Sequence, residues 1–179
     1  RVIKMANLPL TGKVAIVTGA ASPIGLGRAM AVALIQAGAR VAIIDVHEDW
    51  LEETGEYVRN IVGKEYVLTH ACDISDSKSA AAAVDKTINS FGGLHILINN
   101  AGIMRTAGKE KYSRSNFWDI TTDTWSKVMA VNANGPFYMA KASIGHMLRQ
   151  KWGRIIGVTT SVDSMYREGM CPYGPSKAS

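Results

Sequence analysis

A tyrosine and a lysine near the end of the chain have the spacing of an acid/base pair. Tyr173 and Lys177 lie four positions apart at the expected start of a helix, so they share one helix face. An ammonium beside a phenol stabilises the phenolate form of the tyrosine. The spacing therefore predicts that this pair moves a proton to or from a substrate oxygen.

Two hydroxyl side chains precede the pair, at the expected end of a strand. Thr160 lies 13 positions before Tyr173, and Ser161 lies 12 positions before it. Either hydroxyl could hydrogen-bond a substrate oxygen, so both are candidate catalytic residues.

A glycine-containing turn follows the first apolar run. Residues 18–27 read TGAASPIGLG and stand between a predicted strand and a predicted helix. In that position, backbone N–H groups at a helix N-terminus can meet a pyrophosphate. The candidate cofactor-binding residues of this turn are Gly19, Ser22, Ile24 and Gly25.

Acidic and amide side chains follow the next predicted strands. Asp45 closes the second strand, where a carboxylate can accept both ribose hydroxyls of NAD and repel the 2′-phosphate of NADP. Val46 follows it in place of a basic residue, which also favours NAD over NADP. Asp73 and Ile74 follow the third strand, and residues 99–102 (NNAG) follow the fourth. Doubly wound folds bind ligands at these carboxyl ends.

The elements that must position these residues alternate between strand and helix. The predicted strands are 14–17, 40–45, 66–71, 94–98 and 154–159. The predicted helices are 24–37, 49–62, 76–91 and an unbroken 122–150, with another beginning near Tyr173. The segment 103–121 has no clear period, and we interpret it as a long loop with room for one short helical turn.

This alternation indicates βαβ units and a parallel sheet covered on both faces. We therefore expect an α/β fold with a doubly wound, Rossmann-like parallel sheet in the order 3-2-1-4-5. The length of 179 residues favours a single domain over residues 1–179.

Composition narrows the class of protein. A chain that is 47% hydrophobic and 20% charged is globular rather than disordered, and two cysteines do not make a disulfide scaffold. The net charge of +5 comes from scattered residues, so we expect no nucleic-acid partner. No apolar run is long enough for a membrane span, no signal-peptide pattern is visible, and the histidines are isolated. We therefore expect a cytoplasmic protein with no membrane partner and no metal.

Taken together and in this order, the motifs resemble the short-chain dehydrogenase/reductase family. Its pattern is T-G-x-x-x-G-x-G, then N-N-A-G, then Y-x-x-x-K with a serine upstream of the tyrosine. The resemblance implies that Tyr173 is the catalytic acid/base and that Lys177 binds the nicotinamide ribose and assists Tyr173. It implies that Asn132 holds a proton-relay water. The residues that it places against the cofactor are Asp73, Ile74, Asn100, Ala101 and Gly102.

The sequence departs from the family pattern at three places. Pro23 replaces the middle glycine. Because proline lacks an N–H and suits the first helical position, we expect Ser22 to cap the helix and Pro23 to begin it. The N–H groups of Ile24 and Gly25 then remain for phosphate. Thr160 stands at the family's serine position, with Ser161 beside it. Family members also continue past the Tyr-Lys helix, so we interpret the chain as C-terminally incomplete.

Two hypotheses follow. The first is an NAD-dependent enzyme that interconverts a secondary alcohol and a ketone. The second is a non-catalytic dinucleotide-binding or scaffold fragment of the same fold. The resemblance and the apolar content of helix 122–150 also predict a homodimer or homotetramer. The large apolar residues of that helix are Trp125, Met129, Phe137, Met139 and Met147.

Overall fold

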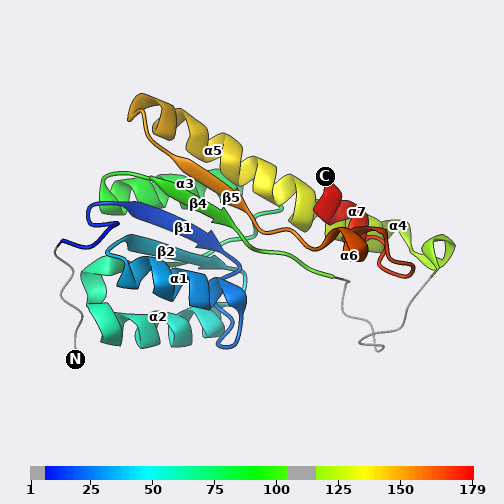
Figure 1. The fold of residues 1–179 in the computed structure, drawn as a ribbon, viewed down its shortest axis with the longest axis horizontal. Coiled ribbons are helices and arrows are strands. Elements are labelled where there is room, and N and C mark those ends of the chain that lie inside the picture. Colours follow the sequence, from blue (N-terminus) through cyan, green and yellow to red (C-terminus); the bar gives the residue numbers. More distant parts are fainter. Residues whose placement is uncertain (1–6, 105–115) are drawn as a thin grey trace.

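The computed structural model describes residues 7–104 and 116–179, so residues 105–115 of the expected loop lie outside the described residues. Its strands form one parallel sheet in the order β3-β2-β1-β4-β5 (Figure 1). This order confirms the predicted doubly wound fold. The strands are β1 (Val14–Thr18), β2 (Arg40–Asp45), β3 (Val67–Ala71), β4 (Ile96–Asn99) and β5 (Arg154–Gly157).

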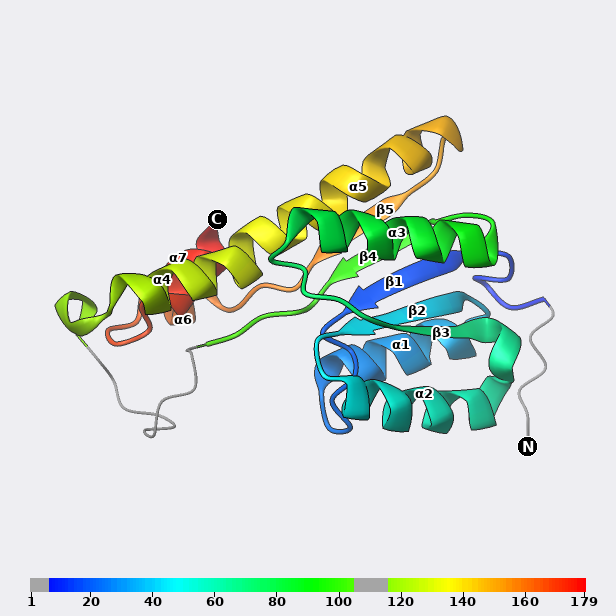
Figure 2. The same ribbon diagram turned by 180° about the vertical axis from the view of Figure 1, so that it is seen from behind.

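Helices cover both faces of this sheet. α1 and α2 lie on one face, and α3 and α5 lie on the other (Figures 1 and 2). The α-helices are α1 (Leu26–Gln36), α2 (Glu48–Val62), α3 (Ser77–Phe91), α4 (Thr122–Met129), α5 (Gly135–Arg149), α6 (Val162–Tyr166) and α7 (Tyr173–Ala178). Two short 3₁₀ helices, η1 (Lys64–Tyr66) and η2 (Phe117–Asp119), and a π-helical turn, η3 (Ala130–Asn134), complete the described elements.

The centre of the sheet is the most deeply buried part of the fold. All five residues of β1 are buried, as expected for a β-branched apolar run with helices on both sides. Its alternate side chains enter two clusters: Ala15 and Val17 pack towards α1 and α2, and Ile16 packs towards α3 and α5. The sheet edge differs, because all four residues of β5 are exposed.

The ends of α3 follow ordinary capping chemistry. The Asp76 carboxylate accepts the Ser79 N–H at 2.7 Å, so Asp76 is the N-cap of the helix. Gly92 ends the helix in a left-handed conformation (φ +78°) that other residues rarely adopt.

The prediction of an unbroken helix over 122–150 is wrong. The structure divides it into α4, the π-turn η3 and α5. Pro136 explains part of this break, because it lacks the N–H that an α-helix would direct at the Asn132 carbonyl. Such π-helical turns within α-helices often occur at functional sites.

The apolar surface expected on this helix is also partly misassigned. Met139 and Met147 are buried in the core beneath the helix. Trp125 and Phe137 do lie at the surface, 42% and 59% exposed. Within the described residues, no helix has the length and apolar character needed to cross a bilayer.

Candidate functional site

The candidate residues gather at the carboxyl ends of the strands. In Figure 1 the strand arrows point towards the end of the molecule where α4, α6 and α7 lie. The glycine turn follows β1, Asp45 ends β2, and residues 100–102 follow β4. The loop after β5 leads through α6 to α7, which begins at Tyr173. The parallel topology therefore brings distant sequence motifs to one edge.

The glycine turn is built differently from the sequence prediction. The N-cap of α1 is Gly25, so Ser22 does not cap the helix and Pro23 does not begin it. Instead, the Gly25 N–H donates to the Ser22 carbonyl at 3.0 Å. Pro23 then occupies the second position of this four-residue turn, which suits its fixed φ.

This turn changes which N–H groups face a ligand. The Gly25 N–H is already bonded, so it does not remain for phosphate as predicted. The first N–H groups of a helix have no intrahelical acceptor, which leaves those of Leu26 and Gly27 at the start of α1. Ile24 itself is almost fully exposed to solvent, at 99%.

Close packing fixes the base of the turn. Gly19 has φ +62°, and a Cβ on it would lie 2.6 Å from the Ala101 Cα. A Cβ on Gly27 would collide with the Gly19 carbonyl oxygen. The Asn100 Nδ2 donates to the carbonyls of Thr18 and Gly19, each at 2.9 Å. The Asn100 amide group therefore holds the turn in place.

Asp45 lies beside this turn. Its Oδ2 accepts the Ala21 N–H at 3.1 Å. Its Oδ1 accepts the Val46 N–H and bonds the His47 Nδ1, both at 2.8 Å. The sequence analysis did not single out His47; its position two residues after Asp45 is the only signal for this contact. The carboxylate is thus held at the edge of the site.

Asp73 and Ile74 separate in the structure. Asp73 is exposed, and its Oδ1 accepts hydrogen bonds from the Ser75 N–H and hydroxyl at 2.9 and 2.7 Å. Ile74 is only 4% exposed, and its side chain packs against Gly135 in the core. Ile74 is therefore part of the core, whereas Asp73 lies at the surface.

Tyr173 and Lys177 share a face of α7. The Lys177 Nζ lies 5.9 Å from the centre of the Tyr173 ring and donates to the Val158 carbonyl at 2.9 Å. Burial lowers the pKa of Lys177 from its ordinary value. Gly102 lies alongside, since a Cβ on it would be 3.1 Å from the Lys177 Nζ. The loop that follows β4 thus meets the lysine of the predicted acid/base pair.

Asn132 is buried between the segment that follows β4 and α7. Its Oδ1 accepts the Ile103 N–H, and its Nδ2 donates to the Ile103 carbonyl, both at 2.8 Å. The same Nδ2 donates to the Ser176 hydroxyl at 2.9 Å. The side-chain amide is therefore engaged with protein groups, and Ser176 is a contact that the sequence analysis missed.

The structure distinguishes the two candidate hydroxyls. Ser161 is the N-cap of α6, a helix that the sequence analysis did not predict; its Oγ accepts the Ser164 N–H at 3.3 Å and donates to the Ser164 Oγ at 3.0 Å. Within the described residues, the half-buried Thr160 has no side-chain hydrogen bond. The neighbouring Thr159 hydroxyl donates to the Lys177 carbonyl at 2.8 Å. Thr160 is therefore the hydroxyl left open to a substrate.

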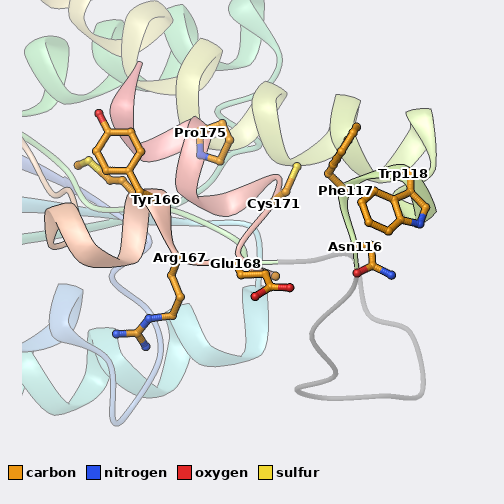
Figure 3. A pocket seen from close by; sticks show the side chains of 10 residues that line it. Asn116, Phe117, Trp118, Tyr166, Arg167, Glu168, Cys171 and Pro175 are labelled. Carbon is orange, nitrogen blue, oxygen red and sulfur yellow. The ribbon is translucent and has the colours of Figure 1, made fainter.

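A cavity of about 250 Å³ lies beside α7 (Figure 3). Phe117 and Trp118 of η2 form one side of it, and Glu168 and Cys171 of the segment between α6 and α7 form another. Pro175 of α7 contributes to the lining, whereas Tyr173 does not. Among the described residues, the cavity is thus a neighbour of the acid/base pair and does not enclose it.

Comparison with known proteins gives a consistent family match. A sequence model described as short chain dehydrogenase matches residues 13–179. An uncharacterized oxidoreductase of Thermotoga maritima is 36% identical over 93% of this chain and 61% of its own length. D-threitol dehydrogenase of Mycolicibacterium smegmatis is 33% identical over 94% of this chain and 60% of its own length.

Solved structures agree with these sequence matches. NAD⁺-bound xylitol dehydrogenase superposes with a TM-score of 0.81 at 28% identity, over 94% of this chain and 61% of that one. A short-chain dehydrogenase/reductase of Burkholderia phymatum in complex with NAD gives 0.81 at 29% identity, over 95% and 57%. The chain therefore spans about three fifths of the length of the proteins it matches.

Proposed function

The chain belongs to the short chain dehydrogenase family, and on that premise we propose that it interconverts a secondary alcohol and a ketone with NAD(H) as cofactor. The observation that carries the proposal is the placement of Tyr173 and Lys177 on one face of α7, with Lys177 against Gly102 in the loop that follows β4. The relatives named above as threitol and xylitol dehydrogenases support a small-molecule alcohol or ketone as substrate.

In this proposal, Tyr173 passes a proton to or from the substrate oxygen. Lys177 assists Tyr173 from 5.9 Å, measured from its Nζ to the centre of the phenol ring, and its bond to the Val158 carbonyl fixes its position. The Thr160 hydroxyl hydrogen-bonds the substrate oxygen, because Ser161 is engaged as the cap of α6. The sequence left both hydroxyls as candidates for this role, and the proposal assigns it to Thr160.

Asn132 acts on the other side of the pair. Its side chain fixes Ile103 and Ser176, so its part in a proton relay falls to its backbone carbonyl. Pro136 cannot donate to that carbonyl as an α-helical residue would. The carbonyl is therefore suited to hold a water close to α7.

The chain's own residues fit a nicotinamide dinucleotide. The left-handed Gly19, the closely packed Gly27 and the N–H groups that open α1 form a turn that a phosphate can approach. The Asp45 carboxylate, whose Oδ2 has one protein donor, can accept ribose hydroxyls and would repel a 2′-phosphate. When bound, the dinucleotide supplies the hydride chemistry. The residues that would line it are Ala101 and Gly102, with Asp73 and Ile74 on the side of the adenine.

The first test is Tyr173→Phe, followed by nicotinamide absorbance with a panel of secondary alcohols, polyols and ketones. Removing the proton donor should lower turnover by about a thousandfold, while NAD affinity and the melting temperature stay unchanged. Tyr57→Phe on α2 is the matched control, since its ring is 48% exposed and lies over Arg28.

Two outcomes would count against the proposal. Near-normal turnover of Tyr173→Phe would move proton transfer to another group. NAD binding without turnover in the unmodified chain, across the whole panel, would instead support the alternative of a non-catalytic dinucleotide-binding protein.

We also propose that the chain forms a homodimer or homotetramer through α4 and α5. The outward side of these helices exposes Trp125, Phe137, Ile144 and Leu148, the last at 69%. Phe137→Glu should shift light scattering at micromolar concentration towards the monomer. A monomeric unmodified chain would contradict this proposal.

A further inference from the structure

Ser176 lies between the two residues of the acid/base pair and is almost completely buried, at 2% exposure. Its Oγ donates to the Tyr173 carbonyl at 2.7 Å and accepts from the Asn132 Nδ2 at 2.9 Å. One hydroxyl is therefore used as donor and as acceptor at the same time. It joins the first turn of α7 to a residue 44 positions earlier in the chain.

The partner of Ser176 is itself firmly fixed. Asn132 is 6% exposed and forms two further hydrogen bonds with the Ile103 backbone. It lies in the π-turn η3, between α4 and α5. Within the described residues, no other side-chain hydrogen bond joins η3 to α7. The Ser176 hydroxyl thus connects η3 with α7, the helix that carries the predicted acid/base pair.

α7 needs such connections because it is short. A helix of six residues is not stable by its own hydrogen bonds, so its position depends on its contacts. On the side of β5, the Thr159 hydroxyl donates to the Lys177 carbonyl, and the Lys177 Nζ donates to the Val158 carbonyl. Ser176 supplies the opposing contact, on the side of η3. Together these bonds fix the rotation of α7 about its axis.

We propose that Ser176 is a positioning residue that holds Tyr173 and Lys177 in register with Asn132. This inference rests on the proposed function of Tyr173 and Lys177. Alanine at this position would remove one acceptor from the Asn132 amide and release the turn of α7 that carries both side chains. A small rotation of α7 moves the phenol away from the substrate oxygen, and catalysis is sensitive to such displacements.

The test compares Ser176→Ala with Ser176→Thr and with Ser143→Ala. Ser143 is the matched control: it is fully buried and its hydroxyl donates to the Met139 carbonyl at 2.7 Å, but this bond stays within α5. Ser176→Ala should lower kcat by roughly tenfold. Ser176→Thr, which keeps the hydroxyl, should recover most of kcat. Ser143→Ala should lower the melting temperature without changing kcat.

Amide hydrogen exchange supplies a readout that does not require turnover. In Ser176→Ala, exchange should become faster in residues 130–134 and in residues 173–178 together, because the bond that joins them is lost. Ser143→Ala should leave both segments unchanged. This arm tests the coupling even if the unmodified chain binds NAD without turnover, an outcome that would overturn the proposed function alone.

Three results would overturn the inference. One is equal loss of kcat in Ser176→Thr and Ser176→Ala, which would show that packing and not the hydroxyl matters. Another is a parallel fall of kcat in Ser143→Ala. The third is faster exchange confined to α7 in Ser176→Ala, which would show that η3 and α7 are not coupled through this residue.

Discussion

β1 and β5 belong to the same sheet but differ completely in their surroundings. β1 is central, with helices on both of its faces, and Ile16 is fully buried. β5 is at the edge, where Ile155 and Ile156 are 41% and 46% exposed. The glycine turn continues from β1, whereas α6 and α7 follow β5. The cofactor half of the candidate site thus rests on the core, and the acid/base half rests on the edge.

This difference shows what holds each half in place. The cofactor half is fixed by contacts so close that no side chain can be added, as at Gly27. The acid/base half is fixed by single hydrogen bonds to short segments, such as those of Ser176 and Thr159. Substitutions should therefore change stability mainly in the first half and turnover mainly in the second.

The largest effect on stability is expected for Gly27→Ala. Its new Cβ would collide with the Gly19 carbonyl and lie 2.6 Å from the Asn100 Nδ2. Moving the backbone at Gly19 to relieve this collision costs much more free energy than moving a flexible side chain. The free energy of unfolding should fall by about 3 kcal/mol, and NAD binding should weaken. Gly157→Ala in β5 is the matched control, since no atom lies within 4 Å of its new Cβ. Urea unfolding of both variants would measure this contrast; equal losses would contradict it.

The second effect concerns cofactor choice. Asp45→Ala combined with Val46→Arg should move the ratio of NAD to NADP affinity towards NADP by at least about tenfold, because a guanidinium pairs with a 2′-phosphate. Fluorescence titrations with each dinucleotide measure this ratio, with Asp49→Ala on the exposed start of α2 as control. Equal affinity of the unmodified chain for both cofactors would show that Asp45 does not select NAD.

A smaller effect compares equal truncations at the centre and the edge. Ile16→Val removes a methylene group from a fully buried side chain and should cost about 1 kcal/mol of unfolding free energy. Ile156→Val removes the same group from a side chain that is 46% exposed and should cost less than about 0.5 kcal/mol. A loss at Ile156 as large as that at Ile16 would mean that β5 is covered in solution.

The fold was largely predictable because the five strands and the longer helices have a clear period. The apolar run of β1 and the alternation of elements suffice for the sheet order. The break at η3 was not predicted, because residues 122–150 keep a helical period throughout and only Pro136 signals the change. Burial of Met139 and Met147 depends on which helix face meets the sheet, and a period alone does not determine that face.

The candidate site was predictable where a short motif brings its residues together. Tyr173 and Lys177 share a helix face because they are four positions apart. The partners of Asn132 and Asn100 were not predictable, since they depend on contacts between distant segments. Our proposal of Thr160 over Ser161 rests on α6, a helix of five residues that has no period to detect.

The smallest predicted effect concerns the opposite end of the sheet, where His95 precedes β4. Its Nδ1 accepts the Val14 N–H at 3.2 Å, and its carbonyl accepts the Arg154 N–H at 2.9 Å. His95 thus connects the central and edge strands at their amino ends. Burial lowers the pKa of His95, and the electrostatic effect of the neighbouring Lys13, His146 and Arg40 lowers it further.

Because the pKa of His95 is lowered in the folded chain, the folded protein should lose stability at low pH. Below about pH 6.5 the unfolded chain binds a proton at His95 that the folded chain resists, so the free energy of unfolding falls as the pH falls. His95→Asn keeps an acceptor but cannot titrate, so the acid dependence of the urea midpoint should become shallower. It should not vanish, because burial and Lys86 lower the pKa of His70 in the same direction. An unchanged slope in His95→Asn would show that the Val14 contact does not resist protonation.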